Sequence, residues 1–102
     1  MKTNGYDSKF QAEIAELFDK LNYDFSYNED EFDLDGIIFT PNFYLPTINT
    51  FITVRSKLTD DIINKVKVLQ KHSNKKSHLI YGNINSFKVF NPTSNTYILD
   101  YN

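Results

Sequence analysis

The sequence predicts an α+β domain in which one mixed β-sheet is flanked by two helices. Residues 9–21 and 59–72 carry apolar side chains at helical spacing, whereas the segments between and after them alternate with the two-residue period of strands. Strand segments lie on both sides of the second helix, so this helix can cross over the sheet and join two parallel strands. A chain of 102 residues suffices for one hydrophobic core, and we expect a single domain over residues 1–102.

The first helix is expected over residues 9–21. Ser8 and Gln11 have the spacing of a capping box, in which the Ser hydroxyl accepts from a helical amide and the Gln side chain reaches back to the cap. Asn22 is expected at the end of the helix because Asn tolerates the left-handed backbone conformation.

Short strands are expected between the two helices. Residues 23–27 and 32–34 alternate apolar with polar side chains, and we expect these two strands to be joined around residues 28–30. Asp35 and Gly36 form a turn dipeptide that leads into residues 37–39. Residues 43–45 and 51–54 flank a turn and are expected to form a β-hairpin.

The second half of the chain predicts one helix and three strands. Asp60 and Asp61 stand in the first turn of the helix at 59–72, where the helix dipole favours acids. A buried strand is expected at residues 78–81, and residues 87–90 and 97–101 are expected to pair as a C-terminal hairpin.

Composition excludes several kinds of site. The chain has no cysteine, which excludes disulfides and thiolate metal ligands and fits a reducing compartment. It has no apolar run typical of a signal peptide or a membrane span, so we expect a cytoplasmic protein that does not enter membranes. Three glycines form no phosphate-binding loop, and the two histidines have no triad partner placed by a motif.

Charge is distributed unevenly along the chain. Residues 1–50 carry ten acids and three bases, whereas residues 51–102 carry three acids and eight bases, for a net charge of −2. The candidate protein-binding acids are Glu29, Asp30, Glu31, Asp33 and Asp35, which could mimic a row of phosphates or dock on a basic groove. The candidate nucleic-acid-binding bases are Arg55, Lys57, Lys65, Lys67, Lys71, Lys75 and Lys76. The alternative in both cases is a solvated surface without a partner.

Four motifs follow one another in a recognisable order: SKFQAEIA at residues 8–15, YNEDEFDL at 27–34, TPNFYL at 40–45 and ITVR at 52–55. Together with the second helix and the strand that ends at Gly82, they resemble the PD-(D/E)xK, or restriction-endonuclease-like, nucleases of the small phage and RecB-related type. The resemblance covers about residues 6–82 and implies an αβββαβ core. The C-terminal hairpin, at about residues 86–101, lies outside it.

The residues depart from this family where its chemistry is carried out. The family holds Mg²⁺ with acids from the first helix, from a Pro-Asp segment and from a Glu-x-Lys strand, whose Lys steadies the nucleophile or the phosphate. The matching positions here are Gln11, Asn42, Thr53 and Arg55. The first three are neutral, and Arg does not readily shuttle a proton. The resemblance therefore implies a scaffold without catalytic residues, metal or cofactor.

Two kinds of partner remain open. The chain is small and rich in Asn, Lys and aromatic residues, and so it resembles proteins of phages that block host defence nucleases or effector complexes, as anti-CRISPR proteins do. The alternative partner is nucleic acid, bound by the basic face of the second helix. An active Mg-dependent endonuclease is the least favoured reading, and the sequence does not predict the oligomeric state.

Overall fold

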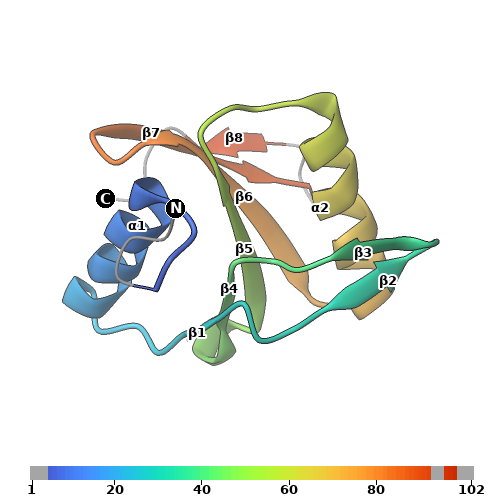
Figure 1. Ribbon diagram of the computed structural model, residues 1–102, viewed down its shortest axis with the longest axis horizontal. Coiled ribbons are helices and arrows are strands. Elements are labelled where there is room, and N and C mark those ends of the chain that lie inside the picture. The colour runs from blue at the N-terminus through green and yellow to red at the C-terminus, as the bar shows by residue number, and fades with distance from the viewer. Residues whose placement is uncertain (1–4, 93–95, 99–102) are drawn as a thin grey trace.

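The computed structural model describes residues 5–92 and 96–98, which form a six-stranded mixed sheet with helices α1 (Lys9–Lys20) and α2 (Asp60–Ser73) on opposite faces (Figure 1). The predicted fold class is therefore confirmed. Along the sheet the strands are β1 (Ser26–Tyr27), β4 (Phe43–Leu45), β5 (Thr50–Arg55), β6 (Lys76–Asn83), β7 (Ser86–Asn91) and β8 (Thr96–Ile98). Neither helix of the described residues is long and apolar enough to cross a membrane.

The crossover through α2 makes β5 and β6 parallel, as the position of the helix in the sequence predicts, while all other neighbouring strands are antiparallel. Both helices begin at a hydroxyl cap. Ser8 Oγ accepts from the Gln11 amide at 3.1 Å, and Thr59 Oγ1 accepts from the Ile62 amide at 3.2 Å. Asn22, after α1, and Asn74, the C-cap of α2, have positive φ, and this conformation ends the helical path.

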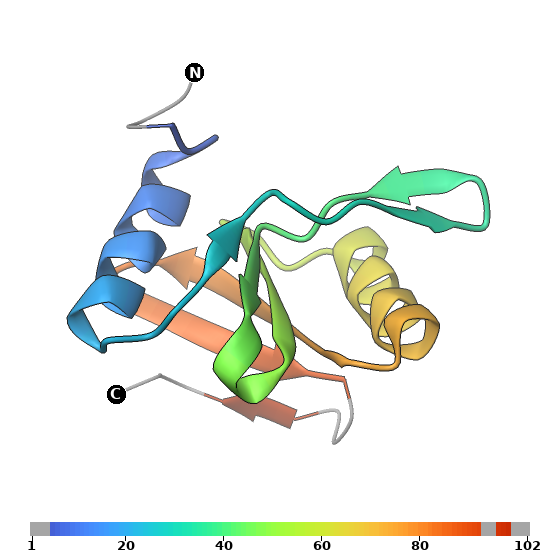
Figure 2. The same ribbon diagram turned by 90° about the horizontal axis from the view of Figure 1, so that it is seen from below.

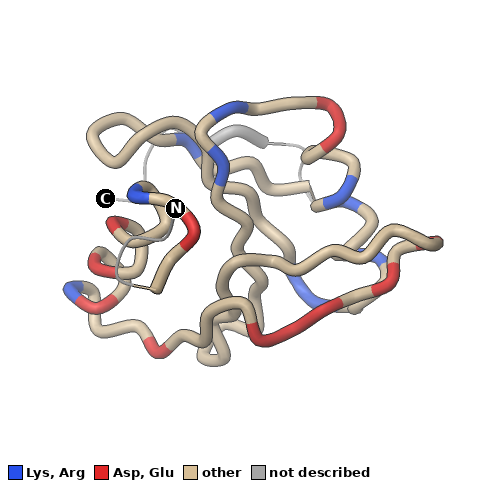
Figure 3. The backbone as a smooth tube through the Cα atoms, viewed as in Figure 1, with Lys and Arg blue, Asp and Glu red and all other residues tan. Residues whose placement is uncertain are grey.

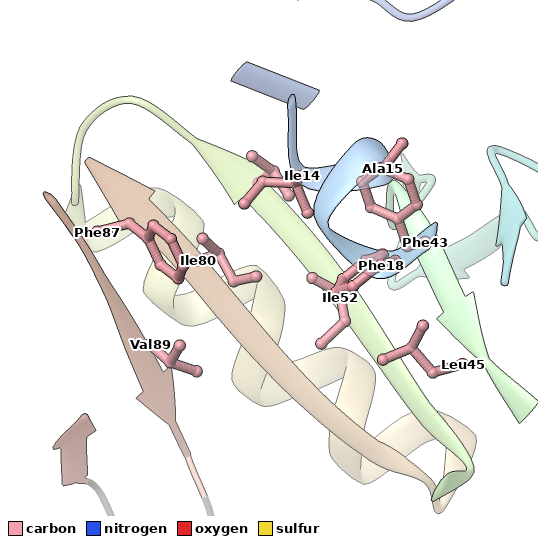
Figure 4. Close-up of a cluster of buried hydrophobic side chains, with 10 residues drawn as sticks. Ile14, Ala15, Phe18, Phe43, Leu45, Ile52, Ile80, Phe87 and Val89 are labelled. Carbon is pink, nitrogen blue, oxygen red and sulfur yellow. The ribbon is translucent and has the colours of Figure 1, made fainter. Parts of the chain in front are cut away.

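The two faces of the sheet carry separate cores because side chains alternate along β5. Ile52 and Val54 belong to the core on the α1 side together with Ile14 and Phe18. The close-up of this core shows Ile52 beside Phe18 of α1 (Figure 4). Phe51 lies in the other core. That core is formed with α2 and contains Leu34, Phe39, Ile62, Val66, Leu69, Leu79 and Phe90.

The strands at residues 23–34 pair differently from the prediction. β1 and β2 (Phe32–Leu34) are not joined to each other: β1 pairs with β4, and β2 pairs with β3 (Ile37–Phe39) in a separate two-stranded sheet. Asn28, at φ 53°, turns the chain while its amide donates to the Asn42 carbonyl at 2.9 Å. The chain therefore leaves the main sheet after β1.

β2 and β3 form a hairpin that extends from the main sheet beside α2 (Figure 2). Its two-residue turn consists of Asp35 and Gly36, both with positive φ, as tight hairpin turns require. Phe39 anchors the hairpin in the α2-side core. This hairpin, residues 32–39, forms a two-stranded sheet of its own.

The C-terminal strands extend the sheet beyond β6. The strand predicted at residues 78–81 is longer, and it returns through a tight turn into β7. Gly82 is needed there because it has φ +118° and because an added Cβ would lie 2.6 Å from the Ser86 carbonyl oxygen. β7 pairs with β8, which confirms the hairpin over the described residues, and residues 99–101 of the predicted strand lie outside them.

Candidate functional site

A polar cavity of about 630 Å³ opens where the N-terminus of α1, the start of β4 and the end of β5 meet. Its volume lies within the usual range for small-molecule sites. Residues from segments far apart in the sequence form its wall: Asp7, Ser8, Phe10, Gln11, Asn28, Thr40, Asn42, Val54, Arg55 and Ser56. Three of the four positions singled out by the nuclease resemblance, Gln11, Asn42 and Arg55, thus line one cavity.

Asn42 is fixed by two hydrogen bonds and is only 5% exposed. Its Oδ1 accepts from the Val54 amide at 2.7 Å and from Arg55 Nη1 at 2.9 Å. Both bonds engage the oxygen, so the orientation of the amide group is determined. Its nitrogen, Nδ2, makes no hydrogen bond among the described residues.

Gln11 is held in the same way from the other wall of the cavity. It is 7% exposed, and its Oε1 accepts from the Tyr27 hydroxyl, whose oxygen accepts in turn from the Asp7 amide at 2.9 Å. The predicted capping box is therefore only half formed, because the Gln11 side chain turns to Tyr27 instead of reaching back to Ser8. Burial raises the pKa of Tyr27, which keeps its hydroxyl protonated as the donor of this bond.

Arg55 is a half-buried cation at the end of β5. Its Nη1 donates to Asn42 Oδ1 and, at 2.8 Å, to the Val54 carbonyl, and both acceptors are neutral. Burial lowers the pKa of Arg55, while the charge of Asp7 acts in the opposite direction. The ion pairs of the described residues are Glu16–Lys20 and Asp61–Lys65, so Arg55 has no carboxylate within 4.0 Å.

Thr53 lies outside the cavity. It is fully buried and in register with Leu79 of the α2-side core, so its side chain points to the sheet face opposite α1. Its Oγ1 has no hydrogen-bond partner among the described residues. Arg55 starts from the same face as Thr53, but it stands at the end of the strand and its long side chain reaches Asn42.

The chemistry of the cavity does not fit Mg²⁺. Magnesium prefers several oxygen ligands in octahedral geometry, and carboxylates supply the charge. Among the described residues, Asp7 is the one acid on the cavity wall, and the amide oxygens of Gln11 and Asn42 already accept hydrogen bonds. The groups that stay available to a ligand are N–H donors: the amide nitrogens of Gln11 and Asn42 and the guanidinium of Arg55.

The predicted basic residues do not share one face of α2. Lys65 and Lys67 lie on opposite flanks of the helix, roughly 160° apart at 3.6 residues per turn. Lys65 pairs with Asp61 at 3.0 Å, Lys67 lies 5.8 Å from the centre of the Phe90 ring, and Figure 3 shows basic positions spread along the helix.

The other bases divide between the two ends of α2. Arg55, Lys57 and Lys65 line a smaller cavity of about 260 Å³ near its N-terminus. Lys75 lies over the Tyr44 ring at 4.7 Å, beyond the C-terminus of the helix. Lys71 and Lys76 are exposed near that same end.

The predicted acidic segment leads into and forms one strand of the hairpin at residues 32–39 (Figure 3). Glu29, Glu31, Asp33 and Asp35 are exposed, and Asp30 is half-buried. Asp33 Oδ1 accepts from the Gly36 amide at 2.7 Å and so also supports the turn. The neighbouring strand β3 carries two exposed isoleucines: Ile37 is 53% exposed and Ile38 is 58% exposed.

Five polar residues of the cavity wall were not predicted as site residues: Asp7, Ser8, Asn28, Thr40 and Ser56. The sequence indicates Ser8 only as a helix cap, and the other four lie in loops that the fold brings together. Comparison of the chain with family models, with curated proteins and with solved structures finds no match in any of the three.

Proposed function

We propose that this protein is a catalytically inactive, nuclease-like scaffold that acts by binding a protein partner through the hairpin at residues 32–39. The observation that carries this proposal is the exposure of Ile37 and Ile38 together, on a two-stranded sheet outside the main one. Consecutive strand residues point to opposite faces, so the hairpin presents an apolar side chain on each. Exposed apolar groups rimmed by polar ones are typical of protein interfaces.

Charge defines the class of partner. Glu31, Asp33 and Asp35 lie on or next to β2, directly beside the two isoleucines. Acidic side chains beside exposed apolar ones match a basic groove, because opposite charges speed the encounter of two proteins and like charges disfavour an acidic surface. A nucleic-acid-binding protein has such a groove. A host defence nuclease or effector complex is the partner of this class that suits a phage-encoded, anti-CRISPR-like inhibitor.

The residues of the polar cavity support the part of this proposal that assigns no nuclease activity to the protein. Hydrolysis of a phosphodiester by Mg²⁺ needs carboxylates to hold the ion and a water that the ion activates. Gln11 and Asn42 supply neutral amides whose oxygens are already occupied. Incubation with plasmid and single-stranded DNA in Mg²⁺ and Mn²⁺ checks this point: we expect no cleavage, and cleavage abolished by Asn42→Ala would contradict it.

The binding proposal is tested by capture from a bacterial host lysate with immobilised wild-type protein and two hairpin variants. Ile37→Ser/Ile38→Ser removes the exposed apolar side chain from each face of the hairpin, and Glu31→Lys/Asp33→Lys reverses the charge beside them. We expect each to reduce recovery of the captured nuclease or effector subunit at least tenfold, because central apolar contacts dominate interface affinity.

The matched control is Ile48→Ser, since Ile48 is 51% exposed but lies in the short helix Pro46–Ile48, away from the hairpin. It should capture as much as the wild type. Equal capture by the wild type and both hairpin variants would overturn the proposal, as would recovery of DNA alone.

A second candidate function is nucleic-acid binding where β5 leads into α2. It is favoured by the position of Arg55, which lines both the polar cavity and the smaller cavity with Lys57 and Lys65. Phosphate contacts by such cations weaken steeply with salt. A gel shift at low salt that Lys57→Glu abolishes and Lys71→Glu leaves unchanged would support it, and no shift at low salt would exclude it.

A further inference from the structure

We propose that the polar cavity binds a phosphate group, free or at the end of a nucleic-acid strand, directly through side-chain N–H donors and without a metal ion. This site is separate from the hairpin and does not depend on the protein-binding proposal. Three features of the cavity wall point to it: a cation with no anion and two amide nitrogens with no acceptor among the residues that the structure describes, and a helix N-terminus.

Arg55 is the first feature. A charge withdrawn from water is costly unless it is paired, and this guanidinium has no carboxylate within 4.0 Å among the described residues. Only Nη1 is engaged, by two neutral oxygens, and the other N–H groups make no hydrogen bond to the described residues. A guanidinium has five donors in a planar fork that suits two oxygens of a phosphate.

The buried amides are the second feature. Gln11 and Asn42 are both more than nine-tenths buried, and both line the cavity. Their oxygens are occupied by Tyr27, by the Val54 amide and by Arg55, which leaves both NH₂ groups as donors without a protein partner among the described residues.

The orientation of Gln11 follows from Tyr27. The Tyr27 hydroxyl accepts from the Asp7 amide and has one proton, which it gives to the Gln11 oxygen. A reversed Gln11 amide would leave that proton without its acceptor. The hydrogen-bond network therefore fixes an excess of donors at the cavity.

The N-terminus of α1 adds a weaker attraction. Helix N-termini carry partial positive charge and unpaired amides, and the first turn of this twelve-residue helix contains no acid that would offset it. Ser8 and Phe10 from this end line the cavity beside the two amides.

The negative charge of Asp7 repels an anion in the cavity. Removing this charge should therefore strengthen phosphate binding, opposite to the effect of removing the Arg55 charge. Its carboxylate is exposed, and Oδ2 accepts from Asn28 Nδ2 at 3.4 Å. Because Asp7 lines the cavity, its negative charge weakens the binding of any phosphate there. Asp7→Asn removes this repulsion and keeps an oxygen that can accept from Asn28.

The experiment is a titration of ¹⁵N-labelled protein with inorganic phosphate, at ionic strength held constant with chloride, followed by NMR. We expect saturable shifts of the side-chain NH₂ signals of Gln11 and Asn42 and of Arg55 Nε–H. Arg55→Gln should weaken phosphate binding at least tenfold, Asp7→Asn should strengthen it several-fold, and Lys71→Gln, at an exposed site on α2, should leave it unchanged.

Gln11→Glu provides a second route if Arg55→Gln fails to fold, since it keeps the acceptor for Tyr27 and places a negative charge at the cavity. It should reduce phosphate binding at least tenfold. No saturable shift of the three side-chain signals in the wild type would overturn the proposal, and so would equal phosphate affinity of the wild type and a folded Arg55→Gln or Gln11→Glu variant.

Two oligonucleotides distinguish the source of the phosphate. If a 5′-phosphorylated oligonucleotide binds at least tenfold more tightly than inorganic phosphate and its 5′-hydroxyl counterpart does not shift the cavity signals, the site takes a nucleic-acid end. If the phosphorylated oligonucleotide binds no more tightly than inorganic phosphate, the site takes the free anion. Both outcomes support a phosphate site.

Discussion

The polar cavity and the hairpin at residues 32–39 depart from ordinary protein surfaces in opposite ways. In the cavity, two buried amides and a half-buried guanidinium line an opening with N–H donors that have no acceptor among the described residues, whereas on the hairpin two isoleucines are exposed to water. Each region therefore presents groups that a partner could contact. The difference between them indicates the partner: fixed polar donors select a small anion, and an exposed apolar strand with acidic neighbours selects a protein surface.

The two regions also depend on different cores. The cavity is formed by α1 and the strand ends that pack on it, whereas the hairpin is anchored in the core beneath α2. The main sheet separates these cores. Substitutions in one layer should therefore affect one region more than the other.

The largest effect is expected from Phe43→Ala. Phe43 is fully buried on the α1 side, and its ring contacts those of Tyr6, Phe18, Phe25 and Tyr27. Its removal should lower the free energy of unfolding by about 3–5 kcal/mol because it deletes a large apolar group and leaves a void. Urea denaturation followed by circular dichroism measures the loss. A change below about 1 kcal/mol would contradict this view of the core.

Phe39→Ala is the matching substitution on the α2 side. Phe39 pairs with Phe32 across the hairpin and lies in the α2-side core. We expect it to loosen the hairpin, to abolish capture of the protein partner and to leave the phosphate-induced shifts of Gln11 and Asn42 in place. Loss of both activities in a variant that remains folded would show that the two regions are not independent.

A smaller effect on stability is expected from Asn42→Ala, and it should differ from that of Thr53→Val. Asn42→Ala leaves the Val54 amide and Arg55 Nη1 without their shared acceptor, and we expect a loss of about 1–3 kcal/mol in unfolding free energy. Thr53→Val removes a buried hydroxyl that has no partner among the described residues, so its stability should be unchanged or up to about 1 kcal/mol higher. Equal destabilisation in thermal or urea unfolding would place Thr53 in the same polar network as Asn42.

Much of the fold follows from signals that lie close together in the sequence. Ser8 and Thr59 begin the helices, and Asp35 with Gly36 makes a tight turn, because each acts on a backbone group within a few residues. The pairing of β1 and β2 was wrong because a distant contact decides it. The Asn28 amide donates to the Asn42 carbonyl, which aligns β1 with β4 and sends the following chain to α2.

The sequence predicted the cavity residues that regular elements position, but not those that loops position. The order of the motifs indicated Gln11, Asn42 and Arg55 together, and all three line the cavity. The period of two along β5 places Thr53 and Arg55 on one face, but only the strand end lets a long side chain turn toward Asn42. Asp7, Asn28, Thr40 and Ser56 reach the cavity through loop conformations that have no periodic signal.

The lysines of α2 show a signal that was present in the sequence and not used. At 100° per residue, Lys65 and Lys67 cannot share a face. The spacing alone therefore argues against a single basic surface on this helix, and the aromatic contact of Lys67 agrees with it.

The smallest effect is expected from protonation of His78, which lies on β6 opposite Ile52 and is not among the residues that line the polar cavity. Both ring nitrogens are buried without a partner among the described residues, and burial, with a smaller contribution from Lys76, lowers the pKa of His78 below its ordinary value of about 6.5. Above about pH 6.5 the ring is neutral in the folded and unfolded chains, and stability is fully present. As the pH falls from there toward the lower folded pKa, the unfolded chain takes up a proton first, so stability decreases.

His78→Leu should remove this decrease, which urea midpoints of the wild type and the variant at about pH 7.5 and about pH 5.5 would measure. Because His78 is on β6 and not on the hairpin, partner capture should not change with this substitution. A wild-type-to-variant difference in midpoint that is the same at both pH values would contradict the assignment.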